Sequence, residues 1–188
     1  ADRPVTTKDE GNTHHEIYTY DAAGNVSQFT DRNGSVVTFT YDDLNQMIQQ
    51  TATLATGVVG PTTTKWYYDA VGRAISAFNG DAKVLRTVNS LSKLESETTW
   101  VTPVSEGSPG ISSKTVNYTY DGDGHLSLLH YPDGSTVVRY TYDSLGRVSV
   151  IEKKRGAGAF DTLASWTFQG PSKMKTLEWG NRTKETMV

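Results

Sequence analysis

Hydrophobic and polar residues alternate along most of this chain in short runs. Aromatic residues stand two positions apart, with a threonine between them, at 18–20, 39–41, 118–120 and 140–142. A period of two is typical of β-strands, because successive side chains point to opposite faces of a sheet. No stretch repeats the i, i+3, i+4, i+7 spacing of an amphipathic helix. The pattern predicts strands over 25–30, 35–41, 125–131, 135–142 and 147–153.

One motif returns along the chain. Tyr-Thr-Tyr-Asp-x-x-Gly ends at Gly24, Gly124 and Gly146, and a shorter Tyr-Asp-x-x-Gly ends at Gly72. A second turn signal, at Gly34 or at Asp133-Gly134, follows in two copies, so the unit recurs about every 20 residues. We therefore expect an antiparallel meander with two turns in each unit.

The motif has a physical reason. An aspartate that begins a four-residue turn accepts hydrogen bonds from backbone N–H groups ahead of it, and glycine at the fourth position tolerates positive φ. Asn45 takes the glycine position in one copy, and asparagine tolerates positive φ better than other non-glycine residues. We assign the turn signature to Tyr20, Asp21, Gly24, Gly34, Tyr41, Asp42, Asn45, Tyr68, Asp69, Gly72, Tyr120, Asp121, Gly124, Asp133, Gly134, Tyr142, Asp143 and Gly146.

This pattern predicts a flexible stretch over residues 1–15 and one repeat array over 16–183. The segment Asn89–Leu94 lacks the tyrosine, aspartate and glycine, so we expect a looser turn there. Trp179-Gly180 resembles the start of a further unit. The expected repeat pairs are 16–53, 65–100, 115–153 and 165–183, with loops at 54–64, 101–114 and 154–162.

Composition and charge exclude several classes of protein. A chain of 188 residues suits one domain and is long enough to bury a sizeable core. Its net charge of −3 is well mixed, so no basic stripe favours nucleic acid. No apolar window predicts a membrane span or a signal peptide. Without cysteine, the chain has no disulfide, no cysteine nucleophile and no cysteine-ligated zinc.

The motif resembles the YD repeat of Rhs proteins. Tyr20-Asp21-x-x-Gly24 and Tyr142-Asp143-x-x-Gly146-Arg147-Val148 match it well, and the resemblance covers roughly residues 16–153. Members are large, mostly bacterial, secreted or cell-surface polypeptides, with relatives in Tc toxin complexes and in teneurins. The resemblance implies a β-sheet wound into a hollow shell that encloses a toxin-like C-terminal domain. Neither the family's Asp- and Pro-rich terminating segment nor a toxin cargo has a counterpart here.

The expected fold is therefore all-β, an antiparallel meander of YD-repeat hairpins that forms a curved sheet or a partial shell or barrel. The resemblance implies a structural role in toxin delivery or at the cell surface, with the remaining repeats and an enclosed domain as partners. An open sheet exposes backbone donors and acceptors at both ends. We expect the piece to close into a barrel-like roll or to pair edge to edge with another copy.

No catalytic constellation stands out, so we expect no enzyme, no metal and no cofactor. His14 and His15 are adjacent and point to opposite faces of an extended chain, and His125 and His130 also diverge. The run Asp121-Gly122-Asp123-Gly124 lacks the last carboxylate of a calcium loop, because Pro132 stands there. Turn chemistry explains it better.

An alternative function is carbohydrate binding or adhesion. Tryptophan and tyrosine rings near the long loops could stack on sugar faces, whereas a tryptophan at a strand end usually covers a hydrophobic face. Exposed coplanar rings in one groove would favour the sugar hypothesis. The candidate residues are Trp66, Trp100, Tyr131 and Trp166.

Overall fold

A computed structural model describes residues 5–8, 15–101 and 113–186, and these residues form strands joined by turns, with no helix among them. The all-β prediction is confirmed. The strands are β1 (Val5–Lys8), β2 (His15–Tyr20), β3 (Val26–Thr30), β4 (Val36–Tyr41), β5 (Met47–Thr53), β6 (Thr63–Tyr68), β7 (Ala74–Asn79), β8 (Ala82–Val88), β9 (Leu94–Val101), β10 (Ser113–Tyr120), β11 (Leu126–His130), β12 (Thr136–Tyr142), β13 (Val148–Arg155), β14 (Asp161–Gln169), β15 (Lys173–Trp179) and β16 (Lys184–Thr186).

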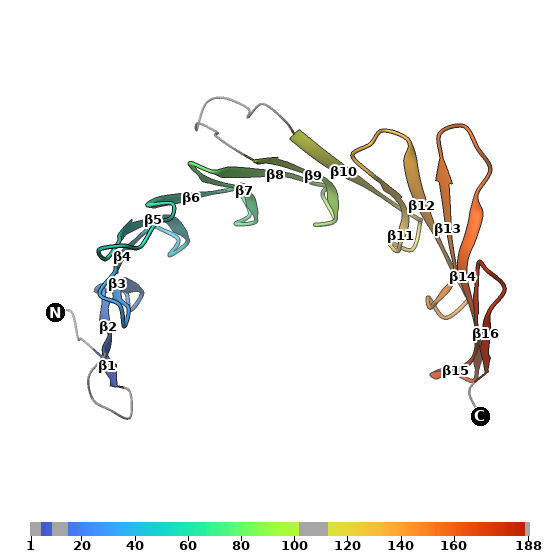
Figure 1. The fold of residues 1–188 in the computed structure, drawn as a ribbon, viewed down its shortest axis with the longest axis horizontal. Coiled ribbons are helices and arrows are strands. Elements are labelled where there is room, and N and C mark those ends of the chain that lie inside the picture. Colours follow the sequence, from blue (N-terminus) through green and yellow to red (C-terminus); the bar gives the residue numbers. More distant parts are fainter. Residues whose placement is uncertain (1–4, 9–14, 102–112, 187–188) are drawn as a thin grey trace. The chain divides into compact units, whose positions relative to one another are not determined.

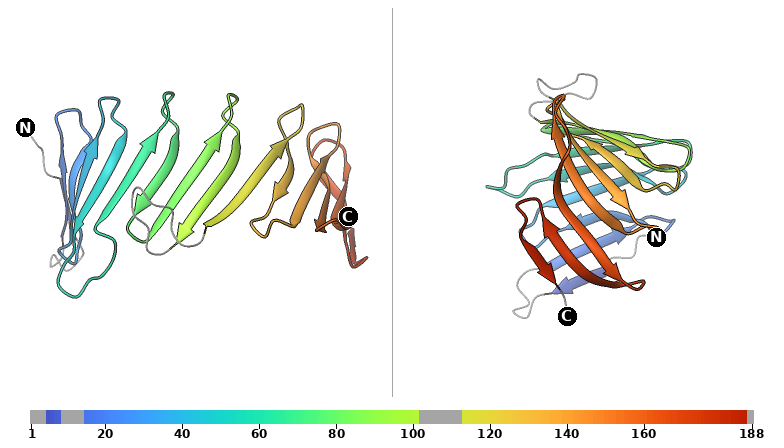
Figure 2. Two further views of the ribbon diagram at one scale, coloured as in Figure 1. Left: turned by 90° about the horizontal axis from the view of Figure 1, so that it is seen from above. Right: turned by 90° about the vertical axis from the view of Figure 1, so that its right-hand side faces the viewer.

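The chain divides into two compact units, residues 1–86 with 99–113 and residues 87–98 with 114–188. Strands β1 to β7 lie wholly in the first unit and β11 to β16 wholly in the second (Figure 1). Within each unit every strand pairs antiparallel with the next strand of the chain. The hairpins of each unit lie side by side in Figure 2. The predicted antiparallel meander of hairpins is therefore confirmed.

In a meander, successive connections lie alternately at the two ends of the strands. Each turn that begins with the Tyr-Asp motif lies at one of these ends, which we call the corner edge. The opposite edge, which we call the loop edge, carries the turns after β3 and β11 and the longer connections 54–62 and 156–160. The repeat therefore keeps one edge regular and lets the other vary.

The two faces of the sheet differ in chemistry. Tyr18 lies opposite Phe29 in the register, and their ring centroids are 4.8 Å apart. On the other face, the Thr19 and Ser27 hydroxyl groups are hydrogen-bonded at 3.0 Å. The paired hydroxyl groups of Thr98 with Thr115 and of Thr167 with Thr176 continue this chemistry in the second unit. We call the two sides the tyrosine face and the threonine face.

A sizeable core, which the length permits, is missing. In the described residues the buried hydrophobic side chains are Val138 and Ala164, and the buried polar ones are Ser35 and Thr136. The accessible surface is 12218 Å², against about 8,900 Å² expected of a compact body of this mass. The reason is the layering: within each unit the described strands contact their neighbours in the chain, and no second layer of described strands covers either face.

Three expected irregular segments differ in extent. Residues 1–15 are not uniformly irregular, because Val5–Lys8 pair with β2 as a β-branched edge strand and His15 begins β2; the rest of that stretch lies outside the described residues. The loop expected at 154–162 shortens to 156–160, because β13 and β14 extend into it. Most of the loop expected at 101–114 lies outside the described residues.

The looser turn expected at Asn89–Leu94 is wrong. The Asn89 N–H donates to the Lys93 carbonyl at 2.9 Å, and the Ser92 N–H donates to the Asn89 carbonyl at 3.0 Å. The Asn89 side-chain oxygen accepts from the Leu91 and Lys93 amides, and Ser92 adopts φ 59°. An amide oxygen thus replaces the aspartate carboxylate, and serine takes the positive φ. The turn has the same geometry as its neighbours.

Candidate functional site

The turns at the corner edge share one hydrogen-bond pattern. The Asp21 N–H donates to the Asn25 carbonyl at 2.8 Å, and the Gly24 N–H donates to the Asp21 carbonyl at 3.2 Å. The Asp21 carboxylate accepts from the amides of Ala23 and Asn25 at 2.9 and 2.8 Å. Gly24 has φ +91°, which completes a three-residue hairpin loop with a bulge. The same bonds recur at the turns that begin with Asp42, Asp69, Asp121 and Asp143.

In four of these turns, hydrogen bonds lower the pKa of the aspartate and favour its charged form. A side-chain hydrogen bond from Arg147 lowers the pKa of Asp143, with an Nη2–Oδ2 distance of 2.6 Å. The backbone hydrogen bond from Arg73 lowers the pKa of Asp69 in the same way, and its guanidinium lies 2.6 Å from the carboxylate. The pKa of Asp121 is also lowered, mainly by the His125 backbone hydrogen bond. These carboxylates act as fixed acceptors within a turn.

The signature residues at the loop edge make related turns. The Asp31 N–H donates to the Ser35 carbonyl, and Gly34 has φ +89°, so this turn copies the corner-edge pattern. The turn around Asp133 is one residue longer, since the Tyr131 N–H reaches the Thr136 carbonyl. The Asp133 carboxylate accepts from the Ser135 and Thr136 amides, and hydrogen bonds led by the Thr136 hydroxyl lower its pKa. Gly134 has φ +70°.

Tyrosine hydroxyl groups join consecutive hairpins. The tyrosine before each aspartate lies at a break in register, so its side chain reaches back to the hairpin before it. From the second corner on, where the tyrosine is present, its hydroxyl donates to a backbone carbonyl of the preceding hairpin. The acceptor is the residue five positions after the aspartate or asparagine that begins the preceding corner. The four bonds run from Tyr41 to Val26, Tyr68 to Met47, Tyr120 to Leu94 and Tyr142 to Leu126, at 2.8 to 2.9 Å. We call these bonds the tyrosine ties.

After the first corner, two positions among the described residues lack a tie. Val88 and Phe168 stand where other copies have tyrosine, and neither side chain has a hydroxyl group. Phe168 keeps the break in register that accompanies the tyrosines, because it pairs with Met174 after a shift. The bulge therefore does not depend on the hydroxyl. Burial raises the pKa of Tyr41 and of Tyr142, which keeps both hydroxyl groups protonated as donors.

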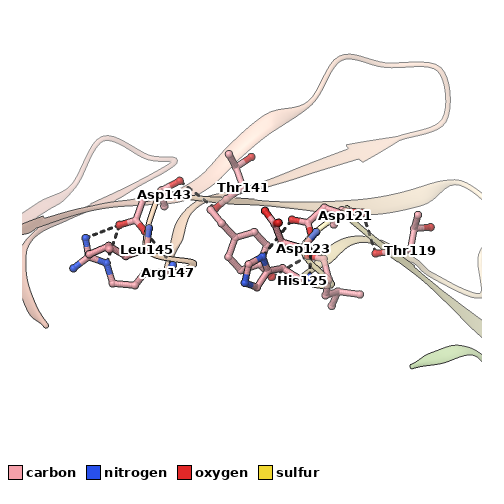
Figure 3. A network of polar contacts seen from close by, with 12 residues as sticks. Thr119, Asp121, Asp123, His125, Thr141, Asp143, Leu145 and Arg147 are labelled. Carbon is pink, nitrogen blue, oxygen red and sulfur yellow. Dashed lines mark hydrogen bonds and ion pairs between the residues drawn. The ribbon is translucent and has the colours of Figure 1, made fainter. Parts of the chain in front are cut away.

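A second link starts at the residue after each turn, four positions beyond the aspartate or its substitute, which we call the reader position. Gln46 Nε2 donates to the Gly72 carbonyl at 3.1 Å, and Arg147 Nη1 donates to the Gly170 carbonyl at 2.7 Å. The His125 ring stacks on Tyr142 with centroids 4.6 Å apart. Figure 3 shows two such turns, with His125 beside Asp121 and Arg147 beside Asp143. Gln46, His125 and Arg147 thus each touch the next corner.

Open furrows lie between consecutive corners. One of about 680 Å³ is lined by Asp121, His125, Tyr142 and Asp143, among others, and one of about 530 Å³ lies between the corners at Asn89 and Asp121. They recur with the repeat and have the same turn residues as walls. No group of three or more histidine, aspartate or glutamate side chains that could hold a metal ion occurs among the described residues. The furrows follow from the repeat geometry.

The candidate sugar-stacking residues are not brought together. Trp66 is half-buried beside Ala77 and Val84, whereas Trp100 lies under the Lys83 ammonium on the opposite face of β8. In the second unit, Tyr131 is 45% exposed at a loop-edge turn, and Trp166 lies opposite Leu177 within the sheet. Within neither unit do two of these rings line one groove. Sugar binding stays a prediction without support from the geometry.

Comparison with known proteins identifies the repeat. A family model described as the RHS repeat matches residues 20–59 and 120–158, which contain the turns at Asp21, Asp42, Asp121 and Asp143 and the ties of Tyr41 and Tyr142. Two segments of the chain thus match the RHS repeat. The resemblance found in the sequence is therefore confirmed for these two segments. A comparison with curated proteins gives no match.

Solved structures show the same fold as this chain. The crystal structures of TcdB2-TccC3-Cdc42 and of TcdB2-TccC3 without its hypervariable C-terminal region each align over 98% of this chain at 12% identity, with a TM-score of 0.80. A Photorhabdus luminescens Tc holotoxin pore with a TccC3 mutation aligns over 95% at 13% identity, with a TM-score of 0.77. This chain spans about a tenth of the length of those chains, since each alignment covers 10% of them.

The sequence did not reveal the links between hairpins. The acceptor of each tyrosine hydroxyl is a backbone carbonyl in another hairpin, which no residue type marks. The reader residues vary among asparagine, glutamine, lysine, histidine and arginine. What they share is a long or polar side chain directly after the glycine position of each corner turn. No helix in the described part of the chain is long and apolar enough to cross a membrane.

Proposed function

We propose that this chain is a structural segment of a larger Rhs-type β-shell, whose role is to enclose or present another polypeptide. The observation that carries the proposal is the pair of links that join consecutive hairpins of a one-layer sheet. Such a sheet obtains its stability from neighbour to neighbour, as repeat arrays do. Both of its faces are free to contact other protein.

The chemistry of the turns supports a mechanical role rather than a reaction. The aspartates of the motif accept hydrogen bonds from their own turns, and hydrogen bonds lower the pKa of four of them at the corner edge. A general acid or base at neutral pH needs the opposite shift, towards the working pH. These four carboxylates are therefore suited to accepting backbone hydrogen bonds and not to proton transfer. We infer that the chain is not an enzyme.

The proposed partners are further repeats of the same polypeptide and an enclosed toxin-like domain. The RHS-repeat match and the likeness to Tc complex structures support this proposal. The resemblance to Rhs proteins also leads us to propose a secreted or cell-surface location in a bacterium. The exposed backbone of the edge strands suits further strand pairing.

The experiment measures the size and contents of the native polypeptide. An antibody against residues 115–153 is used to isolate it from the cells that make it, and its mass is determined under denaturing conditions. We expect a polypeptide several times larger than the 20.6 kDa of this chain. After limited proteolysis, we also expect a second, protected fragment that copurifies with the repeats. A native polypeptide of 20.6 kDa, free of any other chain, would overturn the proposal.

Because the chain has no cysteine, a single introduced cysteine can be labelled at one chosen position in a second measurement. A single cysteine at Tyr118 or at the adjacent Thr119 places a thiol-reactive photocrosslinker on one face or the other. Crosslinks to a polypeptide outside the array are expected from one of these two sites. Absence of crosslinks from both faces in the isolated native protein would contradict the enclosing role.

A further inference from the structure

At several corners the glycine position and the reader residue of the preceding repeat meet in space. A Cβ atom added at Gly72 would lie 2.7 Å from Gln46 Nε2, and one added at Gly146 would lie 2.9 Å from His125 Nε2. The Lys93 side chain lies 3.6 Å from the same place at Gly124. These glycines are therefore sites where a long reader side chain from the previous repeat needs room.

Backbone conformation alone does not require glycine there. Asn45 and Ser92 occupy the same position with φ 59°, and Arg182 has φ 68° in a turn of the same type at the loop edge. The turns at 45 and 92 keep the hydrogen bonds of the others. A second factor must decide where a side chain is allowed at this position.

The size of the reader residue is that factor. Asn45 carries a side chain, and the reader before it, Asn25, is short. The Asn25 amide Nδ2 donates to Asn45 Oδ1 at 2.9 Å, so two short side chains share the space. Glycine follows Gln46, Lys93 and His125, which are longer. In these four pairs, a long reader meets glycine and a short reader meets asparagine. Arg73, the reader before the corner with Ser92, is also long, but its guanidinium binds Asp69 of its own turn at 2.6 Å.

We propose that these two positions form a matching rule that determines which RHS repeat can pack after which. The reader residue recognises the next corner: a long side chain that reaches the glycine position requires glycine there, and a short amide leaves room for asparagine. The surface between corners therefore accepts a repeat hairpin only when the pair is matched. The contacts on which this inference is based do not depend on the proposed shell role. The shell role only gives a reason why such a rule would be useful.

The test is a cycle of substitutions in the full chain: Gly146→Asn, His125→Asn and both together. The control is Gly24→Asn, because an added Cβ at Gly24 has no atom within 4 Å and its φ is also positive. Native-state hydrogen exchange of the amides at 143 and 146 reports opening of the altered corner, and that at 21 and 24 reports the control. These amides are hydrogen-bonded within their own turns.

We expect Gly146→Asn to speed exchange at its corner about tenfold more than Gly24→Asn does at its own, since residues in contact couple by this order. His125→Asn in the same chain is expected to remove most of that excess, because two asparagines then reproduce the pair at 25 and 45. If Gly146→Asn prevents folding, recovery of folding in the double variant is the same result.

Two outcomes would overturn the rule. One is equal acceleration in Gly146→Asn and Gly24→Asn, which would show that conformation alone sets the cost. The other is an excess that persists after His125→Asn, which would show that the reader residue is not its cause. Gly72→Asn with Gln46→Asn repeats the cycle in the first unit. Because the measurement uses this chain alone, its failure would leave the size and crosslinking tests of the shell role unaffected.

Discussion

The hydroxyl group of Tyr142 provides a direct test of the tyrosine ties. It donates to the Leu126 carbonyl at 2.9 Å, and Tyr142→Phe removes this bond and keeps the ring that stacks on His125. Both residues of the tie are half-buried, so water can reach the freed carbonyl and the full cost of an unpaired buried group does not apply. We expect a loss of about 1 kcal/mol, the usual net value of one such hydrogen bond.

Hydrogen exchange across β11 and β12 is a suitable assay, because an array held by neighbour contacts opens locally. A loss of about 1 kcal/mol corresponds to about fivefold faster exchange there. Tyr140→Phe is the matched control, since Tyr140 lies on the same strand and face and its hydroxyl has no hydrogen bond among the described residues. Equal exchange in the two variants would refute the role of the tie.

Three further substitutions test other contacts of the second unit. Asp143→Asn should keep its turn but remove a source of acid sensitivity. The lowered pKa of Asp143 gives stability that is present above the ordinary pKa of aspartate, about 3.9, and is lost as pH falls through the folded value. The thermal midpoint of the variant should therefore fall less than that of the original chain between pH 5 and pH 2. Gly180→Ala places a Cβ too close to the Thr162 carbonyl oxygen, and we expect about 1–3 kcal/mol of destabilisation in urea; an unchanged urea midpoint would contradict that close approach. Phe168→Tyr supplies a missing hydroxyl near the Val148 carbonyl and should slow exchange in β14 by about fivefold, the equivalent of one hydrogen bond; no slowing would mean that the tie needs more than the tyrosine.

Much of the fold was predictable because its signals are local. The alternation around Tyr18 and Tyr140 fixed strand faces, and the aspartate and glycine of each turn act within five consecutive residues. The same locality explains why Asn89 was misjudged. Its side-chain oxygen does what a carboxylate does, and a letter-by-letter match to the motif misses equivalent chemistry.

The links between hairpins were not predictable for the opposite reason. A tyrosine tie depends on the break in register that turns Tyr142 towards Leu126, and register is a property of two strands together. The lack of a large core was also not predictable from the sequence, because half-buried side chains in a one-layer sheet have the same alternation as those of a two-layer sandwich. Layer number depends on what covers a face, and alternation within a strand carries no information about that.

Because each described strand is antiparallel to the one made just before it, folding never has to wait for distant sequence. A hairpin can close as soon as its own residues emerge from a ribosome or a secretion channel, and each closed hairpin offers a template for the next. Low contact order of this kind favours rapid, vectorial folding from the N-terminal end. A very long polypeptide of this architecture can therefore fold by adding one hairpin after another to the part that is already folded.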